Sequence, residues 1–175
     1  MKIIKNNIVL RAIEPEDLEM LRDMINDEEI EESVLGFSYP ISKVEQQNWY
    51  ERVLKDDLNK KWIIEVNSVG VGVVHLSDID WRNRSAQIGI KLHSSTRKQS
   101  GIGYASLLAL QEFAFGVMQL VRLQVKICDT NLPSIHLFTK LGWKKEGVLR
   151  KAYFYKYKYH DVCIYSMLSE DNINY

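Results

Sequence analysis

A short segment with two glycines, Lys98-Gln99-Ser100-Gly101-Ile102-Gly103, has the composition of a phosphate-binding turn. Glycine adopts backbone angles that other residues avoid, so such a turn can direct several consecutive N–H groups at one point. An apolar helix is expected directly after it, and the N-terminus of a helix adds partial positive charge. The segment therefore predicts an anion-binding cradle, best suited to a phosphate group.

The elements expected around this turn place it between a strand and a helix. Ser85 to Leu92 is predicted to be a strand, and Leu107 to Phe115 belongs to a strongly apolar helix. Arg122 to Cys128 alternates between apolar and polar residues, as a strand does. Ser134 to Leu141 is predicted to be a short helix that ends at Gly142. This order is a strand–helix–strand–helix unit.

The remaining segments predict a mixed α/β domain around one sheet. A helix start is favoured at Glu14-Pro15-Glu16-Asp17, and Ser42-Lys43-Val44-Glu45 has the form of a capping box. Turns are expected at Asn67-Ser68-Val69-Gly70 and from Asp78 to Arg84. The fold class is thus α/β, with a single domain expected over residues 1–175. Further strands are predicted at Asn7 to Ile13, Trp62 to Val66, Val71 to Leu76, Trp143 to Leu149 and Asp161 to Leu168.

Composition narrows the function classes. The 175 residues include 23 basic and 23 acidic ones, so no excess of positive charge indicates a nucleic-acid partner. The two cysteines, Cys128 and Cys163, match no metal or redox motif, and we expect a reducing compartment and no bound metal. No segment has the length of a membrane span or the apolar core of a signal peptide. We therefore expect a cytoplasmic protein without a membrane partner.

From the glycine turn onward, the sequence resembles the GNAT superfamily of acyl-CoA-dependent N-acyltransferases. That family carries Gln/Arg-x-x-Gly-x-Gly/Ala between a strand and a helix, and Lys98, Gly101 and Gly103 occupy those positions here. A more specific match is the segment from Asn131 to Trp143, which resembles the family's Asn-x-x-Ser/Ala-Ile-x-Leu-Tyr-x-Lys-Leu-Gly-Phe. Later matches, at 145–150 and 160–162, resemble the branch that acetylates ribosomal-protein N-termini, polyamines and amino sugars.

The resemblance implies a central mixed sheet with a V-shaped split, flanked by helices, and acetyl-CoA as co-substrate. The donor would lie between the strand ending at Leu92 and the strand ending near Cys128. Its pyrophosphate would bind the N–H groups of the glycine turn, and Asn131 and Ser134 would hold the pantetheine arm opposite the first strand. The residues implied in donor binding are Ile90, Lys91, Leu92, Lys98, Gln99, Ser100, Gly101, Ile102, Gly103, Asn131, Ser134 and Phe138.

The implied reaction is direct attack of a neutral primary amine on the thioester. An amine with a pKa of about 10 is mostly protonated at neutral pH, so a proton must be removed. A backbone N–H near Ile90 is expected to stabilise the oxyanion. Phe138 replaces the family's usual tyrosine acid, and its expected role is packing along the donor. Gln87 stands where a glutamate base often falls, and glutamine can orient water or an amine but is no base.

The other titratable residues have a structural and a functional interpretation. His93 joins Gln87 as a candidate for the catalytic step, with a solvated loop position as the alternative. His75 lies in an apolar strand, where a structural role is favoured over one that faces the cleft. Asp78 and Asp80 are interpreted equally as turn formers and as amine-binding groups. Cys128 is expected to be a buried small apolar residue, since direct transfer needs no nucleophilic thiol.

The aromatic and basic segment from Tyr153 to His160 indicates either a nucleic-acid stacking surface or a half-exposed hairpin. The family alignment places a strand turn near Lys156-Tyr157, which favours the hairpin. A phosphorylated or nucleotide-linked substrate near Lys156 and Lys158 is the minor alternative.

The residues that bind the acceptor are less well defined by the sequence. Three aromatic residues, Trp49, Tyr50 and Trp81, either wall the acceptor pocket or pack in the core, and packing is favoured. An acidic cluster after the first helix either attracts a cationic polyamine or aminoglycoside or forms a solvated face. An amino sugar fits the mixed surroundings about as well. The acidic residues are Glu28, Glu29, Glu31 and Glu32.

Two function classes follow. The first is an acetyl-CoA-dependent N-acetyltransferase that acts on a polyamine, amino sugar, aminoglycoside or protein N-terminus, with a homodimer as one assembly. The second is a non-catalytic acyl-CoA-binding regulatory module, motivated by Phe138 and Gln87. A nucleotide-binding loop is excluded, because no Gly-Lys-Ser/Thr follows the turn and no acidic residue has dinucleotide-fold spacing. The expected partner is a small-molecule or peptide amine.

Overall fold

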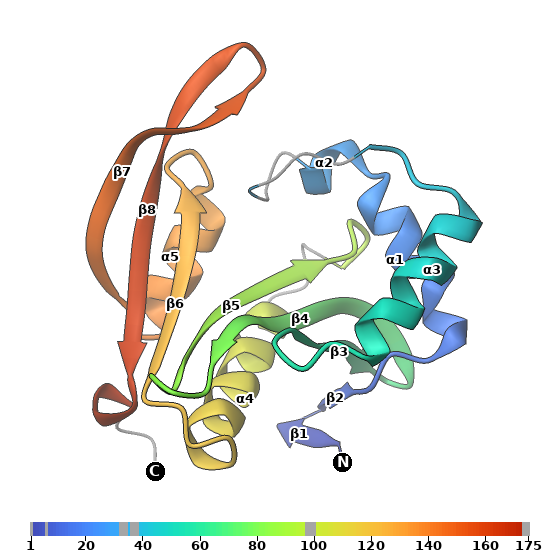
Figure 1. The fold of residues 1–175 in the computed structure, drawn as a ribbon, viewed down its shortest axis with the longest axis horizontal. Coiled ribbons are helices and arrows are strands. Elements are labelled where there is room, and N and C mark those ends of the chain that lie inside the picture. The colour runs from blue at the N-terminus through green and yellow to red at the C-terminus, as the bar shows by residue number, and fades with distance from the viewer. Residues whose placement is uncertain (1, 6, 32–34, 36–38, 97–100, 173–175) are drawn as a thin grey trace.

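One mixed sheet organises the chain, with strands in the order β1-β2-β3-β4-β5-β6-β8-β7 (Figure 1). The computed structural model describes residues 2–5, 7–31, 35, 39–96 and 101–172. The strands are β1 (Ile3–Lys5), β2 (Ile8–Arg11), β3 (Lys60–Val66), β4 (Val69–Asp80), β5 (Ser85–Leu92), β6 (Arg122–Cys128), β7 (Lys144–Tyr155) and β8 (Lys158–Leu168). The α-helices are α1 (Leu18–Ile25), α2 (Glu28–Glu31), α3 (Lys43–Leu54), α4 (Ile102–Gly116) and α5 (Leu132–Lys140), and two 3₁₀ turns are η1 (Pro15–Asp17) and η2 (Ser169–Asp171).

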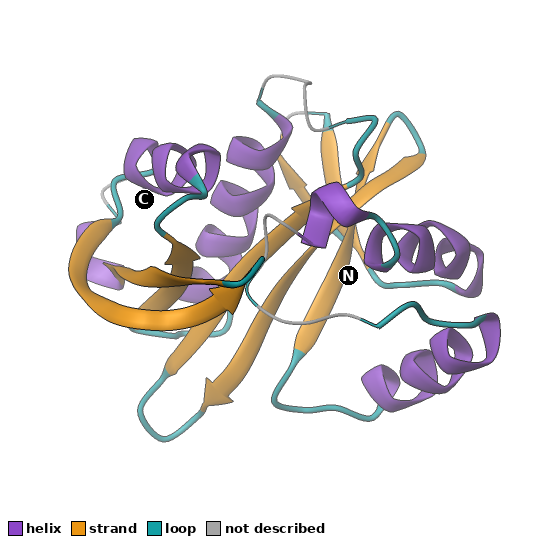
Figure 2. Ribbon diagram, turned by 90° about the horizontal axis from the view of Figure 1, so that it is seen from above, coloured by secondary structure: helices purple, strands orange, loops and turns teal. Residues whose placement is uncertain are grey.

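Helices cover both faces of the sheet, because its central strands alternate buried side chains between the two sides (Figure 2). Ile64 and Val74 belong to a large apolar cluster that also takes in residues of α4 and α5. Ile63 and Val73, one position earlier on the same strands, belong to a second cluster with residues of α1 and α3. The expected mixed α/β fold with a flanked sheet is therefore confirmed.

The starts of the first helices follow from their capping residues. Ser42 accepts a hydrogen bond from the Glu45 amide, and the Glu45 carboxylate accepts one from the Ser42 amide, so the predicted capping box is present at α3. At η1, which leads into α1, the Asp17 carboxylate accepts a hydrogen bond from the Glu14 amide at 2.8 Å, and the Asp17 amide donates to the Glu14 carbonyl at 3.0 Å. Arg11 donates two hydrogen bonds to the Asp17 carboxylate, of 2.7 and 2.8 Å, and so ties α1 to the sheet.

The polar turn predicted from Asp78 to Arg84 is wrong over its first half. β4 continues through Asp80, which pairs with Ser85 of β5. The ladder is irregular between Ser77 and Asp80, and Asp78 has a positive φ of 50° there. A bulge therefore accounts for the polar residues within the strand, and the turn itself spans only residues 81–84. β1 was not predicted, and the strand expected from Asn7 to Ile13 is limited to Ile8–Arg11.

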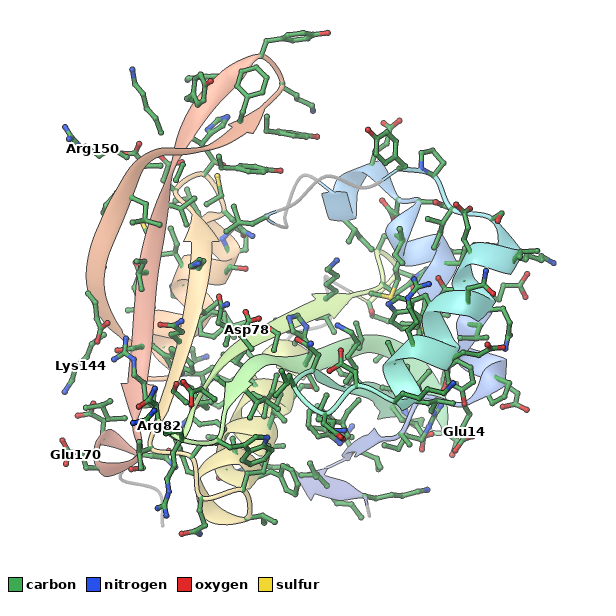
Figure 3. All side chains as sticks on the ribbon, in the orientation of Figure 1. Glu14, Asp78, Arg82, Lys144, Arg150 and Glu170 are labelled. Carbon is green, nitrogen blue, oxygen red and sulfur yellow. The ribbon has the colours of Figure 1, made fainter. Side chains whose placement is uncertain are left out.

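The hairpin expected near Lys156-Tyr157 is confirmed. β7 and β8 pair as antiparallel strands on either side of that turn, where Lys156 and Tyr157 have positive φ values of 46° and 61°. Tyr157 is 97% exposed at the tip. Figure 3 shows the side chains of Lys144 and Arg150 pointing outward from β7. The β7–β8 hairpin is therefore partly exposed to solvent.

Within the part of the chain that the structure describes, no helix has the length and apolar composition needed to cross a membrane.

Candidate active site

The site lies where the two central parallel strands separate. β5 and β6 pair only from Ser85 to Gln87 and from Arg122 to Gln124, although β5 continues to Leu92 and β6 to Cys128. The backbone groups of residues 88–92 that face β6 consequently have no ladder partner on that strand. The split expected between these two strand ends is present (Figure 1), and a cavity of about 450 Å³ occupies it.

Six of the residues predicted for the site line this cavity. β5 contributes Gln87, Ile90 and Lys91, and the segment after β6 contributes Asn131, Ser134 and Phe138. Leu92, His93, Gly101, Ile102 and Gly103 are not among the lining residues. Lys98, Gln99 and Ser100 lie outside the residues that the structure describes.

The described part of the glycine turn leads directly into α4. Gly101 is the residue before the helix and has a φ of 95°, a left-handed conformation that favours glycine. Gly103 lies within the first turn, where a Cβ would come to 3.3 Å from the Leu137 side chain on α5. The glycines therefore allow a sharp entry into the helix and close packing of α4 against α5.

The start of α5 is held by a side-chain cap. Asn131 Oδ1 accepts a hydrogen bond from the Ser134 amide at 3.1 Å, and a proline occupies the first turn. This cap fixes both residues beside the cavity. Phe138, one turn further on, is only 2% exposed, and its ring packs edge-on against Trp143 with centroids 5.0 Å apart. The phenylalanine at the position of the family's tyrosine is therefore a packing residue.

The two candidates for the catalytic step differ in their positions. Gln87 faces the cavity at the point where the strands separate, and its amide donates a hydrogen bond to the Asp78 carboxylate. His93 follows β5, and its Nδ1 lies 2.8 Å from the Ser95 hydroxyl. Asp80 forms the turn cap that was one of its two interpretations, because it accepts hydrogen bonds from the Asn83 amide and side chain.

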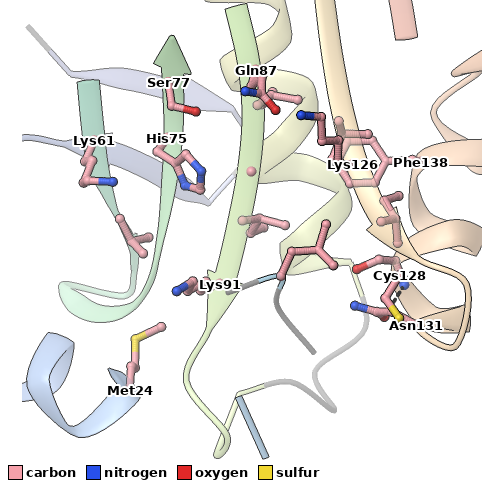
Figure 4. A pocket seen from close by; sticks show the side chains of 18 of the residues that line it. Met24, Lys61, His75, Ser77, Gln87, Lys91, Lys126, Cys128, Asn131 and Phe138 are labelled. Carbon is pink, nitrogen blue, oxygen red and sulfur yellow. Dashed lines mark hydrogen bonds between the residues drawn. The ribbon is translucent and has the colours of Figure 1, made fainter. Parts of the chain in front are cut away.

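The sequence did not predict that three basic residues form a cluster, although Lys91 was expected at the donor and a cleft-facing His75 was the less favoured alternative to a structural role. Lys61 on β3, His75 on β4 and Lys91 on β5 extend from neighbouring strands into the same cavity (Figure 4). His75 is paired with Lys61 on one side and with Gly89 on the other, so its ring lies over the glycine. The period-2 spacing of Gly89 and Lys91 is visible in the sequence, but the pairing across three strands is not.

We expect the imidazole of His75 to remain neutral from pH 8 to pH 5. Burial, followed by the nearby ammonium groups of Lys61 and Lys91, lowers the pKa of His75 from 6.5 to about 3. Because the unfolded chain then binds a proton more readily, His75 should reduce stability progressively as the pH falls from 6.5 toward 3. His75→Gln should remove that part of the pH dependence.

Proton NMR of the imidazole signals tests this expectation directly. The exposed His136 on α5 provides a reference signal in the same spectrum. A His75 titration midpoint between pH 6 and 7 in the free protein would contradict the expected environment.

The three aromatic candidates have different surroundings. Trp49 lines the cavity, and Tyr50 is buried with its hydroxyl donating to the Ile13 carbonyl at 3.3 Å. Trp81 is 53% exposed in the turn after β4, so the packing role favoured for it is wrong. Cys128 is buried at the end of β6, as expected, with its sulfur 3.1 Å from the Thr130 hydroxyl.

Comparison with known sequences places the chain in a family. Residues 7–144 match the family described as "Acetyltransferase (GNAT) domain". An uncharacterised N-acetyltransferase of Bacillus subtilis, YokL, is 30% identical over 94% of this chain and 92% of its own length. A spermidine N(1)-acetyltransferase of Escherichia coli is 25% identical over 91% of this chain and 87% of its own length. The chain belongs to the GNAT acetyltransferase family, as its motifs indicated, and is an N-acetyltransferase of that family.

A solved structure has the same fold. The spermidine N-acetyltransferase of Vibrio cholerae, in complex with CoA and spermine, superposes with a TM-score of 0.88 over 97% of this chain and all of that chain, at 22% identity. The same Vibrio enzyme is also known as a dodecamer. At this level of identity, the similarity establishes the fold.

Proposed function

We propose that the protein transfers an acetyl group from acetyl-CoA to a primary amine by direct attack on the thioester. The observation that carries the proposal is the split between β5 and β6, which opens a cavity beside an unpaired strand edge. An extended pantetheine arm can form hydrogen bonds with such an edge in the manner of an added strand. Relatives with this fold include an enzyme solved with CoA and spermine.

In this proposal the donor lies along the residues expected for it. The backbone of Ile90, Lys91 and Leu92 binds the pantetheine arm from β5. Asn131 and Ser134 bound the opposite side, held there by the cap of α5. The N-terminus of α4 faces the pyrophosphate, with the turn from Lys98 to Gly103 as the cradle.

The chemistry relies on positioning rather than on a strong acid or base. A backbone N–H near Ile90 stabilises the oxyanion, and Gln87 orients the amine or a water molecule. Since glutamine carries no titratable proton, the amine arrives neutral or loses its proton to water. The thiolate leaves without a phenol donor, because Phe138 stands at that position.

Release of free CoA thiol from acetyl-CoA tests the proposal, with polyamines, amino sugars, aminoglycosides and N-terminal peptides offered in turn. Turnover above the rate of thioester hydrolysis is expected with at least one amine, together with the acetylated product in a mass spectrum. Tight acetyl-CoA binding by calorimetry with no turnover on any amine would favour the alternative, a non-catalytic acyl-CoA-binding module.

The proposal includes assembly with further copies of the same chain. The β7–β8 hairpin exposes apolar residues on both of its strands, including Leu149, Phe154 and Tyr159. Exposed apolar surface of this kind favours a protein partner, and the Vibrio relative forms a dodecamer.

A further inference from the structure

The cavity wall opposite α4 carries an unusual amount of positive charge. Lys61 and His75 are paired across β3 and β4, and Val73 and Lys91 across β4 and β5, so all four side chains share one face of the sheet. Ile90 and Leu92 point to the other face, toward Gly103 of α4. The basic groups therefore lie on the side covered by α1 and α3, away from the glycine turn.

Among the described residues, no carboxylate forms an ion pair with either ammonium group. Neither Lys61 nor Lys91 forms an ion pair or a side-chain hydrogen bond within the described ranges. Lys126 also lines the cavity, and none of the lining residues is Asp or Glu across the described parts of the chain. Asp56 is the acid whose charge acts on Lys61, and it already accepts hydrogen bonds from the Leu58 and Asn59 amides.

The described acidic residues on the elements around the cavity either bind other groups or point into solvent. Asp78 is exposed and accepts the Gln87 amide hydrogen. From α1 the lining residues are the apolar Leu21, Met24 and Ile25, whereas Asp23 pairs with Arg22 at the surface. Glu28, the described member of the acidic cluster on α2, is exposed and is not a lining residue.

Burial without a counter-charge is unfavourable for an ammonium group. Burial lowers the pKa of Lys91, and burial together with the charge of Lys91 lowers that of Lys61. An anion placed between the two would restore their solvation and form charge-assisted hydrogen bonds. A polycationic amine in the same place would instead meet charges of its own sign.

We propose that the acceptor is a primary amine that also carries a carboxylate or phosphate group, and that Lys61 and Lys91 bind this anionic group. The inference rests on the proposed acetyl transfer and specifies its substrate class. Neighbouring strands lie about 4.8 Å apart, so Lys61 on β3 is two strand spacings, about 10 Å, from β5. An anion between the two lysines is thus on the order of 5–10 Å from a thioester beside β5, which suits an amino acid or an amino sugar phosphate.

The same lysines could instead bind the phosphates of the donor, and the experiment separates the two sources. The amines are offered as matched pairs that differ only in the anion: glucosamine 6-phosphate with glucosamine, and phenylalanine with its carboxamide. Spermidine serves as the cationic acceptor. We expect kcat/KM to be about 10- to 100-fold higher for the anionic member of at least one pair, the usual worth of hydrogen bonds between charged groups.

Lys61→Met and Lys91→Met remove the charges and keep much of the apolar stem, and Lys145→Met on exposed β7 is the matched control. Each cavity variant should raise KM for the anionic amine about 10-fold or more. KM for acetyl-CoA should stay within twofold of the parent, because the donor is proposed to bind the backbone of Lys91, which Lys91→Met keeps. The control should change neither value. A rise in KM for acetyl-CoA instead would assign the lysines to the donor and overturn the proposal.

Two further outcomes keep this proposal distinct from the acetyl-transfer proposal. Equal use of both members of every pair, or a preference for spermidine, would overturn the anionic acceptor and leave acetyl transfer intact. If no amine is acetylated, the acetyl-transfer proposal fails. Calorimetry with inorganic phosphate and phosphoethanolamine then tests whether Lys61 and Lys91 bind an anion. Binding that is lost in both cavity variants but kept in Lys145→Met would support the anion site, and no binding would overturn it.

Discussion

Phe138→Ala should lower the free energy of unfolding by about 3–5 kcal/mol, the usual cost of removing a fully buried aromatic side chain. The ring is 2% exposed and packs edge-on against Trp143, which is itself 4% exposed. Trp143 Nε1 donates to Gln111 Oε1 at 3.0 Å, and Gln111 Nε2 donates to Asn172 at 2.7 Å. The cavity left by the substitution would thus adjoin a buried hydrogen-bonded network with little freedom to collapse.

Chemical denaturation followed by tryptophan fluorescence and circular dichroism measures this loss. Leu54→Ala is the control, because Leu54 is 62% exposed at the end of α3 and its truncation should change stability by no more than about 0.5 kcal/mol. A loss below about 1 kcal/mol for Phe138→Ala would contradict its role as a core residue. Since natural domains are stable by about 5–15 kcal/mol, the expected loss is a large share of the total.

The central strands could be predicted to the residue because their patterns are strict. Ser85–Leu92 and Arg122–Cys128 have the predicted bounds, since alternation begins and ends beside turn residues. β4 was cut short because Ser77, Asp78 and Asp80 have turn-like chemistry. In the structure a bulge places those polar groups within the strand, a long-range effect of pairing with β5 that local composition does not encode.

The donor side of the candidate site was predictable for a different reason. Asn131 and Ser134 are three residues apart and form a helix cap, a local interaction that a short sequence motif can predict. Lys61, His75 and Lys91 come together only through the register of three strands, and a bulge at Ile64/Glu65 shifts that register between β3 and β4. A single sequence shows neither register nor the absence of counter-charges, so this part of the site required the structure.

Gly89→Ala should lower kcat/KM by about 100-fold, the effect typical of displacing reacting groups by about 1 Å. A Cβ at residue 89 would lie 2.3 Å from Cε1 and 2.5 Å from Nε2 of the His75 ring. Such distances are far inside van der Waals contact, so either the ring or β5 must move. The ring lines the cavity, so its displacement would change the shape of the cavity, whereas a shift of β5 would displace the strand edge proposed to bind the donor and the oxyanion.

Steady-state kinetics of Gly89→Ala, His75→Ala and the double variant form a cycle that identifies the cause. If the clash with the ring is responsible, Gly89→Ala should lower kcat/KM much less when His75 is already alanine. The double variant should then have nearly the kcat/KM of His75→Ala alone. Gly147→Ala on β7 is the matched control, because a Cβ there meets no atom within 4 Å. Activity of Gly89→Ala within twofold of the parent, or a double variant no better than Gly89→Ala, would contradict the argument. Recovery in the double variant would mean that residue 89 must be glycine because the His75 ring occupies the space that a side chain at residue 89 would need.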